Sequence, residues 1–207
     1  MPDHSPENLT LATTGASGSL FIKHLLIAVE CDDRVRNVNF IASDSGLRVL
    51  AEELGLTGRN NLITQLIGQS SVKIHQQQNS DIGANVASGS YPSDAMVILP
   101  CSVGTLARIA NGDASHLIER AADVTLKERR PLVLMVRETP FHLGHLRTMV
   151  RVTEMGAIIA PPLPAFYAQP HSLEDLVDQS VGRALDLFGL DWKPVKRWGL
   201  NVGPIQE

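Results

Sequence analysis

The segment Ala95-Met-Val-Ile-Leu-Pro-Cys-Ser-Val-Gly-Thr105 joins five consecutive apolar residues to a proline and a short polar turn. A short, almost continuous apolar run is typical of a strand that is buried on both faces, as strands of parallel sheets are. The sequence after the turn has helical spacing. This segment therefore predicts a buried strand that passes directly into a helix, and that unit decides the fold.

The same unit recurs along the chain. Apolar runs that alternate with helical segments predict a single α/β domain, doubly wound and mostly parallel, of the flavodoxin or Rossmann type. A polar, Gly- and Ser-rich stretch at 76–92 is interpreted as a long loop. The strands are expected at 9–13, 38–42, 72–75, 95–99, 132–136 and 157–160, and the helices at 20–29, 43–53, in segments up to 127, at 142–154 and at 173–188.

Composition limits the kinds of protein that this chain can be. The 207 residues are 43% hydrophobic, enough for one compact domain, and the net charge of -4 with scattered basic residues argues against nucleic-acid binding. The sequence has no apolar leader and no apolar run of about 20 residues, so we expect a soluble, cytoplasmic protein without a membrane partner. Two cysteines argue against a disulfide framework. A mean hydropathy of +0.02 favours a homo-oligomer.

Two turns that follow predicted strands are candidate ligand sites. Thr14–Gly18 and Ser102–Thr105 both combine small residues, hydroxyl groups and the start of a helix. Backbone N–H groups at a helix N-terminus suit a phosphate or a flavin edge, although such turns are also ordinary turn chemistry. Neither turn is a P-loop or a complete dinucleotide motif. Together they indicate an anionic, planar or phosphorylated ligand.

Charged residues end another predicted strand. Val133-Leu-Met-Val-Arg-Glu-Thr-Pro140 places Arg137 and Glu138 after a buried run, and the rim of a ligand site would explain both charges. Arg120 and Lys127 are seven residues apart and share a helix face, although a solvated helix end is the ordinary interpretation of such residues.

Two further groups are interpreted as structural. Cys101 is a possible thiolate nucleophile, but a small residue that fills a strand–helix turn is the preferred interpretation. His142 and His145 have a spacing that suits metal binding, yet no third ligand is evident. We therefore expect surface or partner-facing histidines at these positions and no metal.

Longer strings carry a family resemblance. TGASG, PCSVGTLARIANG, HLIERAADVTLKERRPLVLMVRETP, HLRTM, GAIIAPPLPAFYAQP and DLVDQSVGRALD resemble, in order and spacing, the UbiX family of flavin prenyltransferases. The resemblance covers about residues 9–190. It implies dodecamers with sites at subunit interfaces, in which the dimethylallyl group of dimethylallyl phosphate is joined to reduced FMN at N5 and then at C6. The product, prenylated FMN, would serve a partner UbiD-type decarboxylase, and no metal would be needed.

The resemblance also implies roles for individual residues. Glu53 matches a carboxylate beside the flavin, and Arg120 a basic residue of the same site. Residues 191–207, with Arg197-Trp198, resemble a tail that closes over the site or a neighbouring subunit, and residues 1–8 are expected to be flexible. The matches to FMN contacts are Gly15, Ala16, Ser17, Ser43, Ser102, Val103, Gly104, Thr105 and Arg137, and those to dimethylallyl phosphate contacts are Lys127, Glu138, Tyr167 and Arg183.

Two departures from the family pattern accompany these matches. Asp81-Ile-Gly83 has no aromatic residue where relatives often carry one, and the tail after Asp191 is only loosely alike. The wall of the prenyl pocket is therefore expected to differ from that of relatives.

Elementary chemistry favours the same residue types. Loss of phosphate from an allylic carbon leaves a phosphate dianion, which a metal-free site must surround with cations such as Lys127, Arg137 and Arg183. A phenol at Tyr167 can donate one more hydrogen bond. Ring closure must release a proton to Glu138, to the departed phosphate or to Glu53. The base, and the choice between a monophosphate and a diphosphate donor, stay open.

Three other functions stay open as alternatives. They are an FMN-dependent decarboxylase of peptidyl cysteines, a decarboxylase of aromatic acids, and a flavin carrier. The turn Pro100-Cys-Ser-Val-Gly-Thr105 and the Lys/Arg/Glu cluster differ from what the cysteine decarboxylases require, so prenyl transfer is the preferred function.

Overall fold

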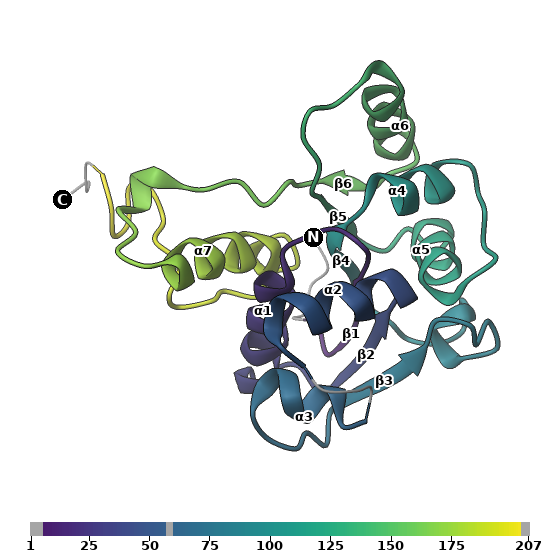
Figure 1. The fold of residues 1–207 in the computed structure, drawn as a ribbon, viewed down its shortest axis with the longest axis horizontal. Coiled ribbons are helices and arrows are strands. Elements are labelled where there is room, and N and C mark those ends of the chain that lie inside the picture. Colours follow the sequence, from purple (N-terminus) through teal and green to yellow (C-terminus); the bar gives the residue numbers. More distant parts are fainter. Residues whose placement is uncertain (1–5, 57–59, 204–207) are drawn as a thin grey trace.

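A computed structural model describes residues 6–56 and 60–203 as an α/β structure built on one six-stranded sheet (Figure 1). All paired strands are parallel. Strands β1 to β3 follow one another toward one edge of the sheet, and strands β4 to β6 follow one another toward the other edge. The direction of winding therefore reverses between the central strands β1 and β4. In spatial order the strands are β3 (Ile74–Gln78), β2 (Asn37–Ala42), β1 (Asn8–Thr13), β4 (Ala95–Cys101), β5 (Leu132–Val136) and β6 (Ile158–Ile159).

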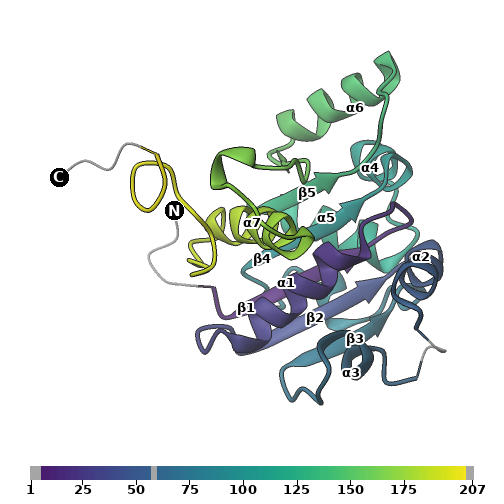
Figure 2. The same cartoon turned by 60° about the vertical axis from the view of Figure 1, so that its left-hand side comes forward.

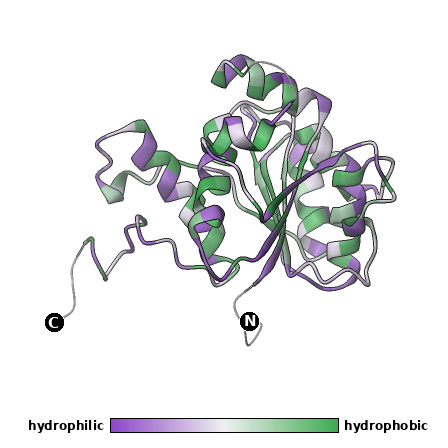
Figure 3. Cartoon of the chain, turned by 90° about the horizontal axis from the view of Figure 1, so that it is seen from below, coloured by the Kyte–Doolittle hydropathy of each residue, from purple (hydrophilic) through white to green (hydrophobic). Residues whose placement is uncertain are grey.

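Helices cover both faces of this sheet, as Figure 2 shows from a second direction. Two clusters of buried side chains lie on the two faces, and residues drawn as hydrophobic in Figure 3 line the strands between the helix layers. One face is covered by α1 (Ser19–Cys31), α3 (Leu62–Ile67), α7 (Leu173–Asp186) and Leu50 of α2 (Asp44–Leu54); the other is covered by α4 (Val103–Ala110), α5 (Leu117–Lys127) and α6 (Leu143–Glu154).

The central strand β4 explains the apolar run at its start. All seven of its residues are buried, with Val97 and Leu99 in one cluster and Met96 and Ile98 in the other. A strand between two helix layers buries both of its faces, so apolar and polar residues do not alternate along it. The prediction of a doubly wound parallel sheet is confirmed.

The predicted element bounds are wrong at β3, which is an edge strand of the sheet. The third strand is β3 at Ile74–Gln78 rather than 72–75, and the predicted loop at 76–92 begins inside it and contains a short 3-10 helix, Asn85–Ala87. Only Ile74 is buried in this edge strand, which explains why its glutamines resemble a loop. No helix was predicted at α3, which has six residues.

The N-terminal prediction falls mostly on residues that the structure leaves undescribed. Residues 1–5 lie outside the described residues. The backbone N–H groups of Glu7 and Asn8 both donate to the carboxylate of Asp94 at 2.8 Å. In the described part of the chain, no helix combines the length and the apolar character that crossing a membrane requires.

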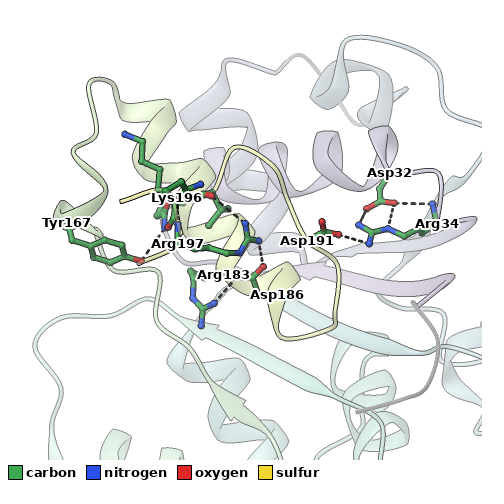
Figure 4. Close-up of polar contacts among 11 residues, drawn as sticks. Asp32, Arg34, Tyr167, Arg183, Asp186, Asp191, Lys196 and Arg197 are labelled. Carbon is green, nitrogen blue, oxygen red and sulfur yellow. Dashed lines mark hydrogen bonds and ion pairs between the residues drawn. The ribbon is translucent and has the colours of Figure 1, made fainter. Parts of the chain in front are cut away.

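Residues 191–203 lie against α7 (Figure 4). The side chain of Val195 is completely buried, and Asp191 forms an ion pair with Arg34 at 2.6 Å. A Cβ atom added at Gly182 would lie 1.6 Å from Cγ2 of Val195. Glycine at position 182 therefore leaves the space that this C-terminal segment occupies.

Gly182→Ala is expected to release this segment from α7. The added methyl group occupies the place of Val195, and overpacking of this kind costs about 1–3 kcal/mol, so trypsin should cleave after Lys196 and Arg197 about tenfold faster. Gly83→Ala is the control, because its new Cβ would meet Asp81 at an ordinary 3.4 Å. Equal cleavage rates in wild type and Gly182→Ala would contradict this packing.

Candidate functional site

The two predicted ligand turns lie side by side at the carboxyl edge of the sheet. Thr14 donates from its backbone N–H and its hydroxyl to the carbonyl of Pro100, at 3.2 and 2.9 Å. The N–H of Ser102 donates in return to the hydroxyl of Thr14 at 2.8 Å. These bonds join the end of β1 to the end of β4, at the point where the winding reverses and where such sheets bind ligands.

The first turn packs closely on the start of α2. Ser43 caps α2 by accepting a hydrogen bond from the N–H of Gly46 at 3.0 Å. A Cβ atom at Gly15 would lie 2.6 Å from the side chain of Ser45, and one at Gly46 would lie 2.8 Å from the carbonyl of Thr13. The structure thus places Gly15, Ala16, Ser17 and Ser43 together, as predicted.

Glu53, near the end of α2, holds the start of α1. Its carboxylate accepts from the N–H groups of Ser19 at 2.7 Å and Gly18 at 3.0 Å. Burial alone would raise the pKa of Glu53, but hydrogen bonds from the Ser17 side chain and from the backbone of Ser19 and Gly18 lower that pKa to about 2. Glu53 is therefore an anion at the carboxyl edge, beside the first turn.

This lowered pKa predicts how acid affects stability. The stabilisation by Glu53 is complete above its ordinary pKa of 4.5 and is lost as the pH falls toward the folded-state value of about 2. The free energy of unfolding of Glu53→Gln should therefore be below that of wild type near pH 6, and this difference should shrink below about pH 4. Urea unfolding at several pH values measures this.

Glu52→Gln provides the control, because Glu52 pairs with Arg48 on the same helix and both side chains are exposed. A difference between wild type and Glu53→Gln that stays constant across this pH range would contradict the hydrogen-bonded carboxylate.

Two residues that the sequence analysis missed, Arg108 and Glu119, help to hold the second turn. Ser102 caps α4 by accepting from the N–H of Thr105 at 3.3 Å. Arg108 donates to the Thr105 hydroxyl at 3.1 Å and to the carboxylate of Glu119 at 2.6 Å. Glu119 is only 3% exposed. The spacing of three between Thr105 and Arg108 on a predicted helix was the available signal, but nothing in the sequence identified the buried Glu119 as the partner.

Val103 and Gly104 complete this turn. Both belong to the first turn of α4, and Gly104 is exposed at the carboxyl edge. The predicted run Ser102–Thr105 therefore lies where a ligand can meet the N-terminus of a helix.

Arg137 and Glu138 lie at the rim of the same edge. The N–H of Arg137 donates to the carbonyl of Cys101 at 3.1 Å, which places it beside the second turn. Its side chain is exposed, while Glu138 is half-buried and accepts a bond from the N–H of Thr139 at 3.0 Å. Both charges therefore lie at the carboxyl edge of the sheet, and their place at the rim of a ligand site stays a prediction.

Lys127 lies at the opposite end of the strands, the amino edge of the sheet. It ends α5, just before β5 begins, and pairs with its neighbour Glu128. Arg120, in the first half of α5, donates to the carbonyl of Ala87 at 3.1 Å and pairs with Asp123 at 2.9 Å. The five residues of β5 span about 13–17 Å, so one copy of the chain does not bring Lys127 to the carboxyl edge.

Tyr167 and Arg183 occupy a third region. Tyr167 lies in the 3-10 helix η2 (Phe166–Ala168), on the long segment between β6 and α7, and its ring meets Trp198 edge-on at 5.9 Å. Arg183 lies on α7 and pairs with Asp186 at 2.7 Å. Because α5 and α7 cover opposite faces of the sheet (Figure 1), the predicted phosphate-binding residues are dispersed within one copy.

The structure also places Cys101 and the histidine pair. Burial raises the pKa of the Cys101 thiol to about 12, and the charge of Glu119 acts in the same direction, so this residue fills the turn as a neutral thiol. Nδ1 of His142 accepts from the N–H of Gly144 at 3.0 Å, and its ring stacks on that of His145 with centroids 3.5 Å apart. Within residues 6–56 and 60–203, no three His, Cys, Asp or Glu side chains converge as metal ligands would.

The chain is similar to known flavoproteins in both sequence and fold. Residues 2–185 match the family model described as Flavoprotein. The chain is 44% identical to "Flavin prenyltransferase UbiX" of Thauera aromatica over 93% of this chain and 94% of that protein. A crystal structure of AnUbiX in complex with FMN and dimethylallyl pyrophosphate superposes with a TM-score of 0.83 at 41% identity, covering 93% and 97% of the two chains. A dodecameric FMN-dependent UbiX-like decarboxylase from Escherichia coli gives a TM-score of 0.83 at 36% identity, covering 92% and 98%.

Proposed function

The chain belongs to the UbiX family of flavin prenyltransferases, and from this premise we propose that it joins a dimethylallyl group to reduced FMN bound at the carboxyl edge of its sheet. The observation that carries the proposal is the pair of hydrogen-bonded turns at the ends of β1 and β4. Their small residues let a planar ring approach the backbone, and the N-terminus of α4 suits a phosphate.

Residues of this chain fit FMN in a consistent way. The first turn, Ser43 and the run Ser102–Thr105 would hold the flavin and its phosphate, and Arg137 would close the rim. The reduced flavin supplies the nucleophile, with attack proposed at N5 and ring closure at C6. Dimethylallyl phosphate is the proposed donor.

The leaving phosphate requires cations that one copy does not bring together. Lys127 at the amino edge, Arg183 on α7 and Arg137 at the carboxyl edge lie in separate places. We therefore place the reaction centre between copies of the chain, as the dodecameric relative makes reasonable. The side chains of Leu143, Leu146 and Val150 on α6 are 60%, 46% and 58% exposed, and such an apolar surface favours burial against another copy.

Glu138 is the better candidate for the base of ring closure. Both oxygens of Glu53 accept backbone N–H bonds, and its pKa of about 2 makes it a weak base. Glu138 accepts one bond, from Thr139, and lies at the rim of the site. The product would be prenylated FMN, and a UbiD-type decarboxylase is its proposed recipient.

The test is an anaerobic incubation of the purified protein with chemically reduced FMN and dimethylallyl phosphate, followed by mass spectrometry of the released flavin. A gain of one five-carbon prenyl unit supports the proposal, and parallel samples with dimethylallyl diphosphate identify the donor. Unmodified FMN with both donors would contradict it. Release of carbon dioxide from an aromatic acid by the protein alone would instead favour a decarboxylase.

A further inference from the structure

Gln179 is a buried polar residue that has no role in the account so far. It lies on α7, and only 4% of its surface is exposed. Its side-chain amide makes three hydrogen bonds. Nε2 donates to the carbonyl of Lys196 at 2.8 Å and to the hydroxyl of Tyr167 at 3.3 Å, and Oε1 accepts from the N–H of Lys196 at 3.0 Å. One amide thus joins the segment between β6 and α7, α7 itself and the C-terminal segment.

These bonds fix which way the amide faces. The backbone N–H of Lys196 can only donate, so the oxygen of the Gln179 amide must face it. The amide nitrogen then faces Tyr167 and must donate to the phenol oxygen. Because the phenol accepts this bond, its own hydrogen stays free to donate to another group.

The surroundings hold the phenol and Arg183 relative to α7. The Lys196 ammonium donates to the carbonyl of Ala168, the residue after Tyr167, at 2.7 Å. Arg183 is four residues after Gln179, one helical turn along α7. Asp186 pairs with Arg183 at 2.7 Å and with Arg197 of the C-terminal segment at 2.5 Å, as Figure 4 shows.

We propose that Gln179 is a positioning residue for recognition of the phosphate of the prenyl donor. It directs the free hydrogen of the Tyr167 phenol toward the phosphate that Arg183 also binds, and it docks the C-terminal segment in the same bond network. This inference rests on the proposed function and on the contact of Tyr167 with dimethylallyl phosphate that the family resemblance implies.

Gln179→Glu keeps a hydrogen bond between residue 179 and the Tyr167 hydroxyl but reverses its direction. The carboxylate still accepts from the N–H of Lys196, but it has no N–H to donate. It therefore loses the bond to the Lys196 carbonyl, and the Tyr167 hydroxyl must turn and donate to it. The phenol hydrogen is then lost to the phosphate. We expect kcat/KM for dimethylallyl phosphate to fall about tenfold or more in Gln179→Glu and in Tyr167→Phe alike, as for one lost hydrogen bond to a charged group.

The double variant decides between positioning and mere support of the fold. If Gln179 acts through the phenol, Gln179→Glu should lower kcat/KM much less in a Tyr167→Phe background than in the wild type, because the hydrogen that it misdirects is already gone and only the bond to the Lys196 carbonyl is newly lost. The dissociation constant of FMN should stay at the wild-type value in all three variants. Ser180→Ala is the matched control, because the Ser180 hydroxyl donates to the carbonyl of Leu176 on the same helix.

Each outcome has a definite meaning. Two losses that multiply in the double variant, or wild-type kcat/KM in Gln179→Glu, would overturn the proposal while prenyl transfer by the wild type still stood. No prenylated flavin from the wild type would overturn the proposed function and this inference together. Should Gln179→Glu fail to fold, uncharged Gln179→Met replaces it in the same cycle, where independent losses would again overturn the proposal.

Discussion

Arg183→Ala is expected to lose prenyl transfer while FMN still binds. The guanidinium stabilises charge that develops on the departing phosphate, and removal of one such group lowers kcat by about 100- to 1,000-fold. The fold should tolerate the change, because Arg183 is exposed and Asp186 keeps its pair with Arg197. Single-turnover formation of prenylated FMN measures the loss, and a flavin titration measures binding.

Arg36→Ala is the control for the loss of an exposed arginine. Arg36 forms an exposed pair with Glu7, at 3.4 Å, next to the amino end of β2. Its removal should leave turnover unchanged. Full activity of Arg183→Ala would contradict the assignment of Arg183 to the phosphate.

Lys127→Ala is expected to have a similarly large effect, although Lys127 lies far from the carboxyl edge of its own copy. The ammonium group would reach the phosphate bound by a neighbouring copy, and its loss should lower kcat by about 100-fold with FMN affinity unchanged. Initial rates at saturating dimethylallyl phosphate measure this.

Lys23→Ala, on α1, is the matched lysine control and should retain wild-type rates. Wild-type turnover of Lys127→Ala would contradict the claim that Lys127 contacts the phosphate bound by a neighbouring copy.

Local patterns predicted most of the fold. The strand Leu132–Val136 was predicted with its observed bounds, because continuous apolar runs mark strands buried on both faces. Ser43 marked the start of α2 through its capping side chain. The edge strand β3 was misplaced because one buried residue, Ile74, carries too weak a pattern, and α3 was missed because six residues hold fewer than two helical turns.

The site could be predicted only in part. Turns that end neighbouring strands come together in any parallel sheet, so the grouping of Gly15, Ser102 and Arg137 follows from local patterns. The bonds of Gln179 and Glu119 join residues that are 11 to 17 positions apart or belong to different elements, and no local spacing reveals them. The separation of Lys127 from Glu138 likewise follows from the direction of α5 and β5 rather than from any motif.

Mixed oligomers test most directly whether prenyl transfer occurs at a centre shared between copies. Lys127→Ala and Glu138→Ala, each expected to be inactive alone, are unfolded together, refolded in equal amounts and assayed for prenylated FMN by mass spectrometry. If Lys127 and Glu138 of one site come from different copies, about one quarter of the sites regain both residues, and activity should return to roughly that fraction of wild type. A mixture as inactive as the two separate variants would contradict the shared centre.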